Sequence, residues 1–446
     1  MNTQQAETGV VVVGGGLAGL SAAGYLARAG VPVTLFEQAA GLGGRAATQQ
    51  YADYCFNRGI HALYPGGAAA QVLQELGVTY GGHRPGGVLI RHQGRLHLLP
   101  AGPGTLLRSG VLAAGDKWEL MRLLTLLTLT KPAALRRQSV QGWLAAHTRR
   151  PPVRQVIAAL ARTFTYTAAL DQVSAEVFVT QLQQALKHNV RYIDGGWQSL
   201  VDGLRRAATQ AGAQIVSGCG VAAVEHDGPQ VQAVRLRDGR TVPAAAVILA
   251  TPPQDAARLI DGGADPAWRT RVADRGPVVV ACLDVALRRL PNPRHPVVFD
   301  ADQPRFLTAQ SQFARIAPPG GALIHTVKYL DPAQPTDAQT DRQDLEALLD
   351  TAQPGWRSVL VKSIYLPRME AVSWLPTARG GGLAGRPDAA VPGLAGLYLA
   401  GDWVGPTGYL VDSSLASARQ VAHLLLQGGL ATARAGVARQ PVAAGR

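Results

Sequence analysis

Three glycines near the N-terminus have the spacing of a phosphate-binding turn. They fit the pattern G-x-G-x-x-G between an apolar, strand-like run at 10–13 and a helical pattern at 21–28. The first glycine permits a tight turn, the second lets the backbone approach a pyrophosphate, and the third lets helix and strand pack closely. The N–H groups at the start of the helix then face the phosphates. The predicted phosphate contacts are Gly14, Gly16, Leu17, Ala18 and Gly19.

A second strand pattern at 31–36 leads directly into Glu37. An acidic residue at this distance from the glycine turn accepts hydrogen bonds from the ribose of an adenine dinucleotide. Gln38 follows it, where a basic residue would be needed to hold a 2′-phosphate. We therefore expect a dinucleotide other than NADP, with Glu37 and Gln38 at its ribose.

The same six letters occur again at residues 380–385, which gives an internal control. No apolar strand precedes this second copy. Arg386-Pro387 follows it, and proline prevents a helix from starting directly there. The second copy is predicted to be a loop.

Gly43-Gly44-Arg45-Ala46-Ala47-Thr48 lies a few residues beyond Glu37. A guanidinium there can return to the pyrophosphate and bind it in a bidentate manner. The glycine turn, the glutamate and this Gly-Gly-Arg-x-x-Thr segment together resemble the flavin-containing amine oxidase superfamily. That superfamily includes monoamine and polyamine oxidases, protoporphyrinogen oxidases and phytoene dehydrogenase-like carotenoid enzymes. The resemblance implies FAD as the cofactor, with Gly44 and Arg45 among its contacts.

The resemblance extends to the C-terminal part of the chain. A strand-like run at 397–403 contains Gly-Asp, and a helical pattern follows at 412–425. In the superfamily this aspartate holds the ribityl or pyrophosphate region, and the helix points its N-terminus at the flavin pyrimidine, where its dipole favours negative charge. A strand pair at 213–224 resembles the one that brackets adenine. The further FAD contacts implied are Gly59, Ile60, His61, Val221, Gly401, Asp402, Val411, Asp412 and Ser413.

The chain of 446 residues is long for one core and suggests two lobes. We expect an α/β fold with a discontinuous Rossmann-like FAD-binding domain and an α+β substrate domain, of the amine oxidase/phytoene desaturase type. The predicted FAD-binding segments are 8–80, 190–260 and 388–428, the substrate segments are 81–189 and 261–387, and 430–446 is a loose tail.

The three cysteines have neither disulfide nor metal-ligand spacing. We expect reduced, buried thiols, no metal site, non-covalent FAD and a cytoplasmic setting. No apolar run approaches the roughly 20 residues that span a bilayer. Nucleic acid is not an expected partner, because no recognition motif or basic-aromatic stripe occurs.

The formal charge of +13 is concentrated in one region. Residues 117–191 contain eleven Lys or Arg and three Asp or Glu, and this region includes a leucine-rich helical pattern at 118–129. Apolar side chains beside clustered arginines suit a helix lying on an anionic membrane. Residues 117–137 are therefore either a membrane-contacting surface or a helix buried in the substrate lobe.

Enzymes of this family transfer a hydride equivalent from a C–H bond to flavin N5, while the protein positions and desolvates the substrate. Amine oxidases of the superfamily carry a lysine near N5 on a strand of the substrate lobe. The nearest match here, residues 277–283, has none. Lys328 and Lys362 lie in strand-like runs of that lobe, and both are expected on its surface. Paired tyrosines of an amine-binding cage are not evident.

Two residues are candidates for catalysis. The resemblance places His61 near the isoalloxazine, where it acts as an acid or base or instead shapes the loop by hydrogen bonding to a carbonyl. Tyr409, near Trp403, either lines the pocket or packs it. Family members often carry an acidic residue at the position of Asn57, so this sequence departs from the family pattern at that flavin contact.

Residues 193–200 resemble the Gly-Gly turn of phytoene dehydrogenase-like and protoporphyrinogen oxidase-like members. Together with the missing lysine, this favours an FAD-dependent dehydrogenase or desaturase that acts on a small apolar substrate such as an isoprenoid or polyene. The alternatives are an amine or amino-acid oxidase, a protoporphyrinogen oxidase-like enzyme, and an FAD-binding protein without turnover. The electron acceptor is left open.

Overall fold

The computed structural model describes residues 9–260 and 276–430. Its first sheet is parallel and has the strand order β17-β11-β1-β2-β7. The strands are short and rich in valine and leucine, as expected for a parallel sheet covered on both faces. Their bounds are Val10–Val13 (β1), Val33–Glu37 (β2), Gln214–Ser217 (β7), Ala246–Leu249 (β11) and Leu397–Leu399 (β17).

Four helices pack together beside this sheet, with α1 against α8 and α12, and α12 against α2. A three-stranded antiparallel sheet, β10-β9-β8, meets β11 through β9, and α9 contacts β8. The bounds are Leu17–Arg28 (α1), Ala68–Glu75 (α2), Gln198–Gln210 (α8), Pro253–Leu259 (α9), Val411–Leu425 (α12), Val221–His226 (β8), Val231–Leu236 (β9) and Thr241–Pro243 (β10).

The second large sheet has seven strands in the order β16-β12-β15-β14-β13-β5-β6. All its pairs are antiparallel except β13 with β5. Helix α11 (Ala338–Ala352) packs on one face. The strand bounds are Val88–His92 (β5), Arg95–Leu98 (β6), Val278–Leu287 (β12), Val297–Asp300 (β13), Arg305–Thr308 (β14), Ala322–Tyr329 (β15) and Leu360–Val372 (β16).

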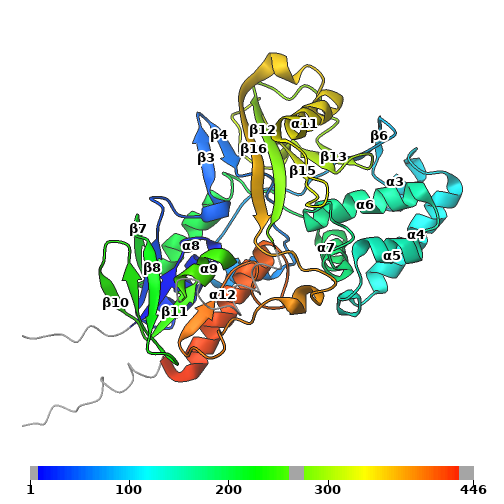
Figure 1. The fold of residues 1–446 in the computed structure, drawn as a ribbon. Coiled ribbons are helices and arrows are strands. Elements are labelled where there is room, and N and C mark those ends of the chain that lie inside the picture. Colours follow the sequence, from blue (N-terminus) through cyan, green and yellow to red (C-terminus); the bar gives the residue numbers. More distant parts are fainter. Residues whose placement is uncertain (1–8, 261–275, 431–446) are drawn as a thin grey trace, which may run out of the picture.

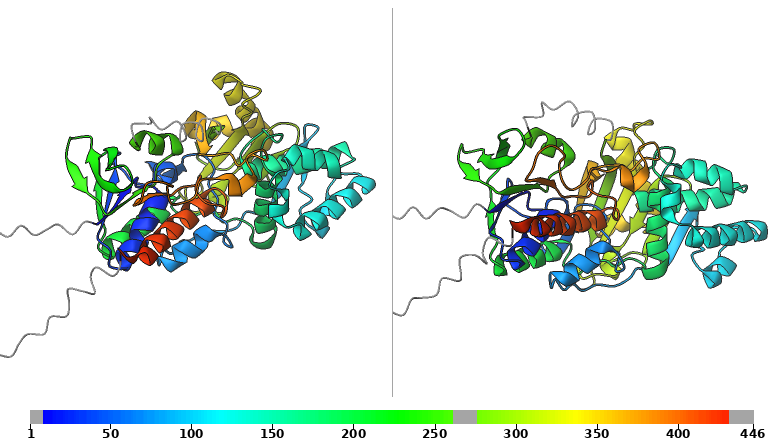
Figure 2. Two further views of the ribbon diagram at one scale, coloured as in Figure 1. Left: turned by 60° about the horizontal axis from the view of Figure 1, so that its bottom comes forward. Right: turned by 90° about the horizontal axis from the view of Figure 1, so that it is seen from below.

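A group of helices forms the end of the molecule that lies farthest from the parallel sheet (Figure 1), and the two views of Figure 2 show the same arrangement. A hairpin, β3-β4, lies near the junction of the two sheets. The bounds are Pro103–Arg108 (α3), Ala114–Leu129 (α4), Val140–His147 (α5), Pro151–Thr165 (α6), Ala175–His188 (α7), Thr48–Tyr51 (β3) and Tyr54–Asn57 (β4).

The α/β fold with a parallel sheet is confirmed, and the first strand has the predicted bounds. The first helix begins at Leu17, so residues of the glycine turn form its first turn. The second glycine copy is a loop with a short 3₁₀ turn, Gly382–Gly385, as predicted. Of the predicted tail at 430–446, residues 431–446 lie outside the described residues.

Every strand of the parallel sheet lies in a segment predicted for FAD binding, and every strand of the seven-stranded sheet lies in a segment predicted for the substrate lobe. The prediction of buried thiols is wrong for two cysteines: Cys282 is buried, but Cys55 and Cys219 are half-buried. Within residues 9–260 and 276–430, we find no helix with the length and apolar character needed to cross a membrane.

Candidate functional site

The glycine turn has the backbone geometry that its sequence predicts. Gly14 has φ of +111°, which favours glycine. A Cβ added to Gly19 would lie 2.0 Å from the carbonyl oxygen of Gly14, so helix α1 packs too closely there for a side chain. A Cβ at Gly16 would meet nothing within 4 Å. The second glycine therefore faces open space next to the start of α1, where the phosphates are predicted.

The starts of α1 and α12 both present backbone donors. Neither helix has a side-chain cap. Among the described residues, the N–H groups of Leu17, Ala18, Val411 and Ser413 have no hydrogen-bond acceptor, whereas that of Asp412 donates to Tyr409 O at 3.2 Å. Unpartnered N–H groups at a helix start favour an anion. The donors of α1 and the open space at Gly16 fit the phosphates of a dinucleotide, whereas the start of α12 is the predicted contact of the flavin pyrimidine.

Glu37 is held at the end of β2 by backbone donors. Its Oε2 accepts from Gly15 N at 2.7 Å, and its Oε1 accepts from Ala39 N at 2.8 Å. A carboxylate has further acceptor capacity on both oxygens, so ribose hydroxyls can still bind. Gln38 Oε1 accepts from the guanidinium of Arg237 at 3.0 Å. Val221, the predicted adenine contact, is buried at the start of β8.

Arg45 and Asp402 were predicted as separate contacts to the cofactor, but in the structure they pair with each other. Two guanidinium nitrogens of Arg45 each lie 2.8 Å from an oxygen of Asp402. Burial would raise the pKa of Asp402, but Arg45 and the N–H of Ser373, at 2.9 Å, hold it below its usual value. Gly44 faces open space. The pair thus joins the Gly-Gly-Arg turn to the loop after β17.

Asp412 directs its side chain toward helix α2. Its Oδ1 accepts from Ala69 N at 2.8 Å, and a Cβ at Gly67 would lie 2.3 Å from its carboxyl oxygens. Burial raises the pKa of Asp412 to about 6, partly offset by the Ala69 N–H. The Gly401 N–H donates to Ser417 Oγ at 2.9 Å. Asp412 therefore helps fix α12 relative to α2.

Sequence reasoning missed Arg386, which follows the second glycine copy. Its guanidinium is buried and donates to Asp402 O at 2.9 Å and to Gly408 O at 2.8 Å. Burial lowers its pKa to about 10, so it is charged at neutral pH. Glu176 Oε2 accepts from Leu383 N at 2.9 Å and anchors the same loop. The only sequence signal was an arginine directly after an unexplained glycine repeat.

Residues 57–61 lie against strands of the seven-stranded sheet, among them β12 and β16. Gly59 has φ of +76°, and a Cβ there would lie 2.6 Å from Met369 Cε and 3.0 Å from Cys282 Sγ. Asn57 Oδ1 accepts from Thr48 Oγ1 and Trp197 N, at 2.9 and 3.0 Å. Asn57 therefore joins the Gly-Gly-Arg turn to the Gly-Gly turn before α8.

His61, one of the two predicted catalytic residues, lies in this segment. Its Nδ1 is 3.2 Å from Gly59 O, and its ring centroid is 4.8 Å from that of Trp197. Burial lowers its pKa to about 4, which outweighs the effect of the Gly59 carbonyl. The imidazole is therefore neutral at pH 7. The carbonyl contact matches the loop-shaping role, and the neutral ring also retains acid–base capacity.

Tyr409, the other predicted catalytic residue, is fully buried, and its hydroxyl donates to Thr165 O at 2.9 Å. Burial raises its pKa well above the usual range, so the phenol stays protonated. Trp403 is also buried and donates from Nε1 to Thr251 O at 3.0 Å. Tyr409 thus joins the end of α6 to the loop before α12.

The prediction that both lysines lie on the surface is wrong for Lys328. Lys328 is buried on β15, 2.9 Å from Asp341 and 2.5 Å from Asp344, both on α11. These carboxylates outweigh the effect of burial and raise its pKa. Lys328 faces α11, on the opposite side of the sheet from the face that Ile60 contacts. Lys362 is exposed, 5.2 Å from the ring centre of Tyr51.

The face toward Ile60 carries a polar pair that the sequence did not reveal. Asp284 on β12 and His325 on β15 are directly paired in register, and Oδ1 and Nδ1 are 2.9 Å apart. Both side chains are at most 1% exposed. Asp284 Oδ2 and His325 Nε2 have no hydrogen-bond partner among the described residues. Cross-strand register, which sequence does not give, brings them together.

Buried and half-buried tyrosines also lie near this face, although the sequence showed no tyrosine pair. The rings of Tyr166 and Tyr329 meet edge to face, 6.1 Å apart between centroids. Tyr166 OH donates to Ile60 O at 3.2 Å. Burial raises the pKa of Tyr192 to about 12. These phenols are protonated at neutral pH, and the edge-to-face arrangement differs from a cage of two parallel rings.

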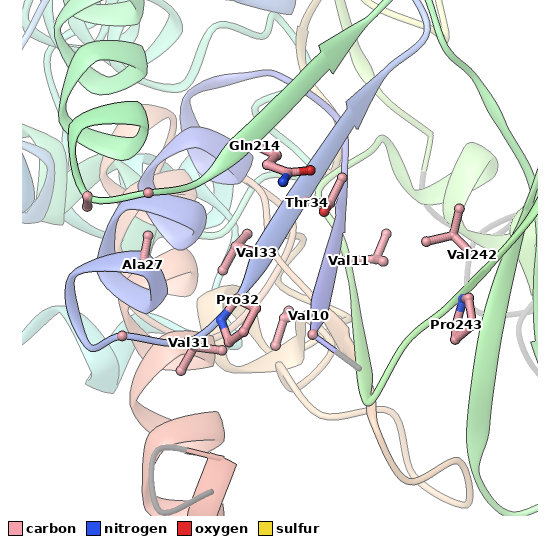
Figure 3. Close-up of a pocket in the computed structure, with 14 residues that line it drawn as sticks. Val10, Val11, Ala27, Val31, Pro32, Val33, Thr34, Gln214, Val242 and Pro243 are labelled. Carbon is pink, nitrogen blue, oxygen red and sulfur yellow. The ribbon is translucent and has the colours of Figure 1, made fainter. Parts of the chain in front are cut away.

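A cavity of about 510 Å³ lies at the opposite edge of the parallel sheet from the glycine turn (Figure 3). It borders the first residues of β1 and β2, whereas dinucleotides bind at the carboxyl ends of such strands. Uncharged residues line it, including Val10, Pro32 and Val242. This cavity is therefore not the nucleotide site.

Comparison with known proteins identifies the family. The family model described as flavin containing amine oxidoreductase matches residues 17–426. The chain belongs to the flavin-containing amine oxidoreductase family. Its members bind FAD. This protein is therefore an FAD-dependent oxidoreductase. A search of curated protein sequences finds no match.

Solved structures of low sequence identity share the fold. An oxidoreductase from Methanosarcina mazei has a TM-score of 0.73 and 20% identity, covering 93% of this chain and 99% of its own. Putrescine oxidase bound to putrescine has a TM-score of 0.74 and 18% identity, covering 94% and 99%. A protein from Exiguobacterium sp. 255-15, provisionally described as a protoporphyrinogen oxidase, has a TM-score of 0.66 and 18% identity, covering 95% and 99%.

Proposed function

We propose that this protein dehydrogenates a small apolar substrate, such as an isoprenoid or polyene, with FAD as the hydride acceptor. The observation that carries the proposal is the lining of the sheet face that packs against Ile60. Val280, Cys282 and Tyr329 share that face and are buried and uncharged. Apart from the Asp284–His325 pair, this face is apolar, which suits a hydrocarbon better than an ammonium ion.

Two ion pairs lie near this face. Asp284 lies against His325, and Arg45 lies against Asp402. Lys328 is bound to two carboxylates on the other side of the sheet, and Lys362 is exposed beside Tyr51. Among the described residues, neither strand lysine is therefore placed for the water bridge of an amine oxidase.

When bound, FAD accepts a hydride equivalent at N5. The chain contributes positioning and exclusion of water. Arg45, Asp402 and the N–H groups at the start of α1 would hold the pyrophosphate and ribityl region, and those at the start of α12 would face the flavin pyrimidine. His61 is neutral at pH 7 and can accept a proton that leaves the substrate beside the hydride, but its pKa of about 4 makes it a weak base. We keep His61 and Tyr409 as the candidate catalytic residues.

An amine oxidase is the second candidate. The rings of Tyr166, Tyr192 and Tyr329 favour it, because aromatic rings bind cations through their faces. We rank it second because Tyr166 and Tyr329 meet edge to face and Tyr166 OH is bound to Ile60 O.

We also propose that the protein works in the cytoplasm at a membrane surface, where apolar substrates accumulate.

The first experiment is an absorption spectrum of the purified protein, followed by anaerobic mixing with three substrate classes. These are phytoene-like polyenes in detergent, protoporphyrinogen and a panel of amines. Bleaching of the flavin band by polyenes alone supports the proposal. Bleaching by amines or by protoporphyrinogen alone replaces it with the corresponding activity, and a band that no compound bleaches contradicts it.

A further inference from the structure

Helix α4 buries its acidic side chains and exposes apolar ones. Leu120, Leu123 and Leu127 are buried against the helical group. Asp116 and Glu119 are buried as well. Asp116 Oδ1 lies 3.2 Å from the guanidinium of Arg150, and Glu119 Oε1 accepts the backbone N–H groups of residues 149 and 150. Both acidic side chains of α4 thus point inward and bind partners inside the protein.

The opposite side of α4 carries a stripe of large apolar side chains. Trp118, Met121 and Leu129 are 67%, 44% and 78% exposed. With Thr125, they have the spacing i, i+3, i+7 and i+11, which places them on one face of a helix. Leu107, at the end of α3, is 78% exposed, and its carbonyl accepts from Lys117 Nζ at 3.0 Å, next to Trp118. We call Leu107, Trp118, Met121 and Leu129 the α4 patch.

The α4 patch is unusual for this molecule. Among the described residues, only eight large hydrophobic side chains are clearly exposed, and four of them form the patch. Single exposed apolar residues are normal, but a cluster marks an interaction surface. In Figure 1, α3 and α4 lie at the far end of the molecule from the parallel sheet, so a flat partner can reach the patch.

Positive charge surrounds the α4 patch. Residues 103–150 contain eight Lys or Arg and two acidic residues, and those two are the buried Asp116 and Glu119. The exposed basic residues include Arg108, Arg122 and the adjacent pair Arg136 and Arg137. Arg122 donates to His147 O at 2.7 Å and keeps its charge. The outer surface therefore combines apolar anchors with unopposed cations.

We propose that the α4 patch and the surrounding basic residues dock this protein on a lipid bilayer surface that carries anionic headgroups. Apolar side chains enter the boundary between headgroups and acyl chains, while lysines and arginines lie among the phosphates. The proposal deepens the proposed function, since it gives a surface from which an apolar substrate is taken. The docking argument itself rests only on exposure and charge.

The test measures sedimentation of the FAD-loaded protein with vesicles that contain no substrate. One set is phosphatidylcholine, and the other is phosphatidylcholine with phosphatidylglycerol. We expect binding to the anionic set that weakens as salt concentration rises. The double variant Trp118→Ser/Leu129→Ser should lose binding by about tenfold or more. The matched control, Val361→Ser/Leu424→Ser, alters two exposed apolar residues elsewhere and should bind like the parent.

A second pair of variants tests charge. Arg136→Gln/Arg137→Gln should weaken binding about tenfold, because each basic residue near an anionic surface adds affinity. Arg205→Gln/Arg206→Gln removes an adjacent, exposed arginine pair from α8 and should have little effect. The flavin content of every variant, read from its absorption spectrum, confirms that it is folded.

Three outcomes overturn the proposal: no binding to anionic vesicles, equal loss in patch and control variants, or unchanged vesicle binding combined with a switch from dimer to monomer in Trp118→Ser/Leu129→Ser. The last would assign the α4 patch to a second copy of the chain. The substrate proposal fails separately. If the protein binds vesicles but only amines bleach its flavin, the docking surface is supported and the apolar substrate is ruled out.

Discussion

The two large sheets of this molecule present different chemical groups to their surroundings. The parallel sheet presents backbone: glycines 14, 16 and 19 and the N–H groups at the starts of α1 and α12. The seven-stranded sheet presents side chains, and its charges are matched across strands or onto α11, as with Asp284–His325 and Lys328–Asp341. The backbone geometry of the parallel sheet can be recognised in the sequence, because it needs glycines at fixed spacing. The pairing of side chains on distant strands can hardly be recognised there.

The largest effect is expected where the parallel sheet depends on the absence of a side chain. Gly19→Val places a Cβ 2.0 Å from Gly14 O, so α1 must move away from β1. We expect more than about 3 kcal/mol of destabilisation and at least a tenfold loss of bound FAD. The ratio of flavin to protein absorbance measures it. Gly41→Ala, whose Cβ would meet nothing within 4 Å, should retain FAD; equal loss in both variants would remove the backbone argument.

Arg45→Ala tests the ion pair that joins the Gly-Gly-Arg turn to the loop after β17. It leaves the buried carboxylate of Asp402 without its cation, at a cost of about 2 kcal/mol, since Arg45 itself is 40% exposed. FAD retention should also fall. The double variant Arg45→Ala/Asp402→Asn should recover part of the stability, as thermal unfolding of the apoprotein would show. Additive losses would mean that the pair is not coupled.

The stability of the Arg45→Ala variant should depend on pH differently from that of the parent. In the parent, the folded pKa of Asp402 is lowered. Its contribution to stability is present above the unfolded pKa of about 3.9 and is lost as pH falls through the folded pKa. In Arg45→Ala, burial is no longer offset by the guanidinium, so the folded pKa rises. The variant should then lose the charge of Asp402 at a higher pH than the parent.

His61→Gln tests the segment between the two sheets. The folded pKa of His61 is about 4, below the unfolded value of about 6.5. The unfolded chain therefore takes up a proton first, and stability is lost as pH falls from about 6.5 toward 4, by on the order of 3 kcal/mol. His61→Gln should flatten this part of the stability curve. A catalytic role would also slow anaerobic flavin reduction with FAD content unchanged, whereas a loop-shaping role would not.

The smallest effects are expected at the two lysines of the seven-stranded sheet. Lys328→Met should cost about 1 to 2 kcal/mol, because Asp341 keeps Arg368 as a partner. Lys362→Met, at an exposed site, should change stability by less than about 0.5 kcal/mol. Neither should affect flavin reduction. Loss of bleaching in Lys328→Met with normal FAD content would restore the amine oxidase interpretation.

Local requirements made the parallel sheet predictable. The glycine turn, Glu37 and the Gly-Gly-Arg segment lie within 35 residues of one another, and their spacing alone fixes a strand, a turn and a helix. The positions of Arg45 and Asp402 were predicted, but their contact was not, because 357 positions separate them.

The rest of the molecule depends on contacts that sequence patterns do not contain. The sequence predicted Lys328 on the surface because its partners, Asp341 and Asp344, lie on α11. The sequence does not show on which side of the sheet that helix packs. Asp284 and His325 meet only through strand register. In α4, leucines occur on several sides, so the pattern alone did not say whether the helix is buried or exposed. In the structure the helix has a buried side, which includes Asp116 and Glu119, and an exposed apolar side.

The ion pair between Arg45 and Asp402 also has a consequence for protein synthesis. The first part of the FAD site is made early, but Asp402 is added only 357 positions after Arg45. A product truncated between them would carry the glycine turn and yet lack the partner of Arg45. Cofactor uptake would thus separate molecules that contain both parts of the site from molecules that lack the second, and the yellow colour of flavin would report the difference.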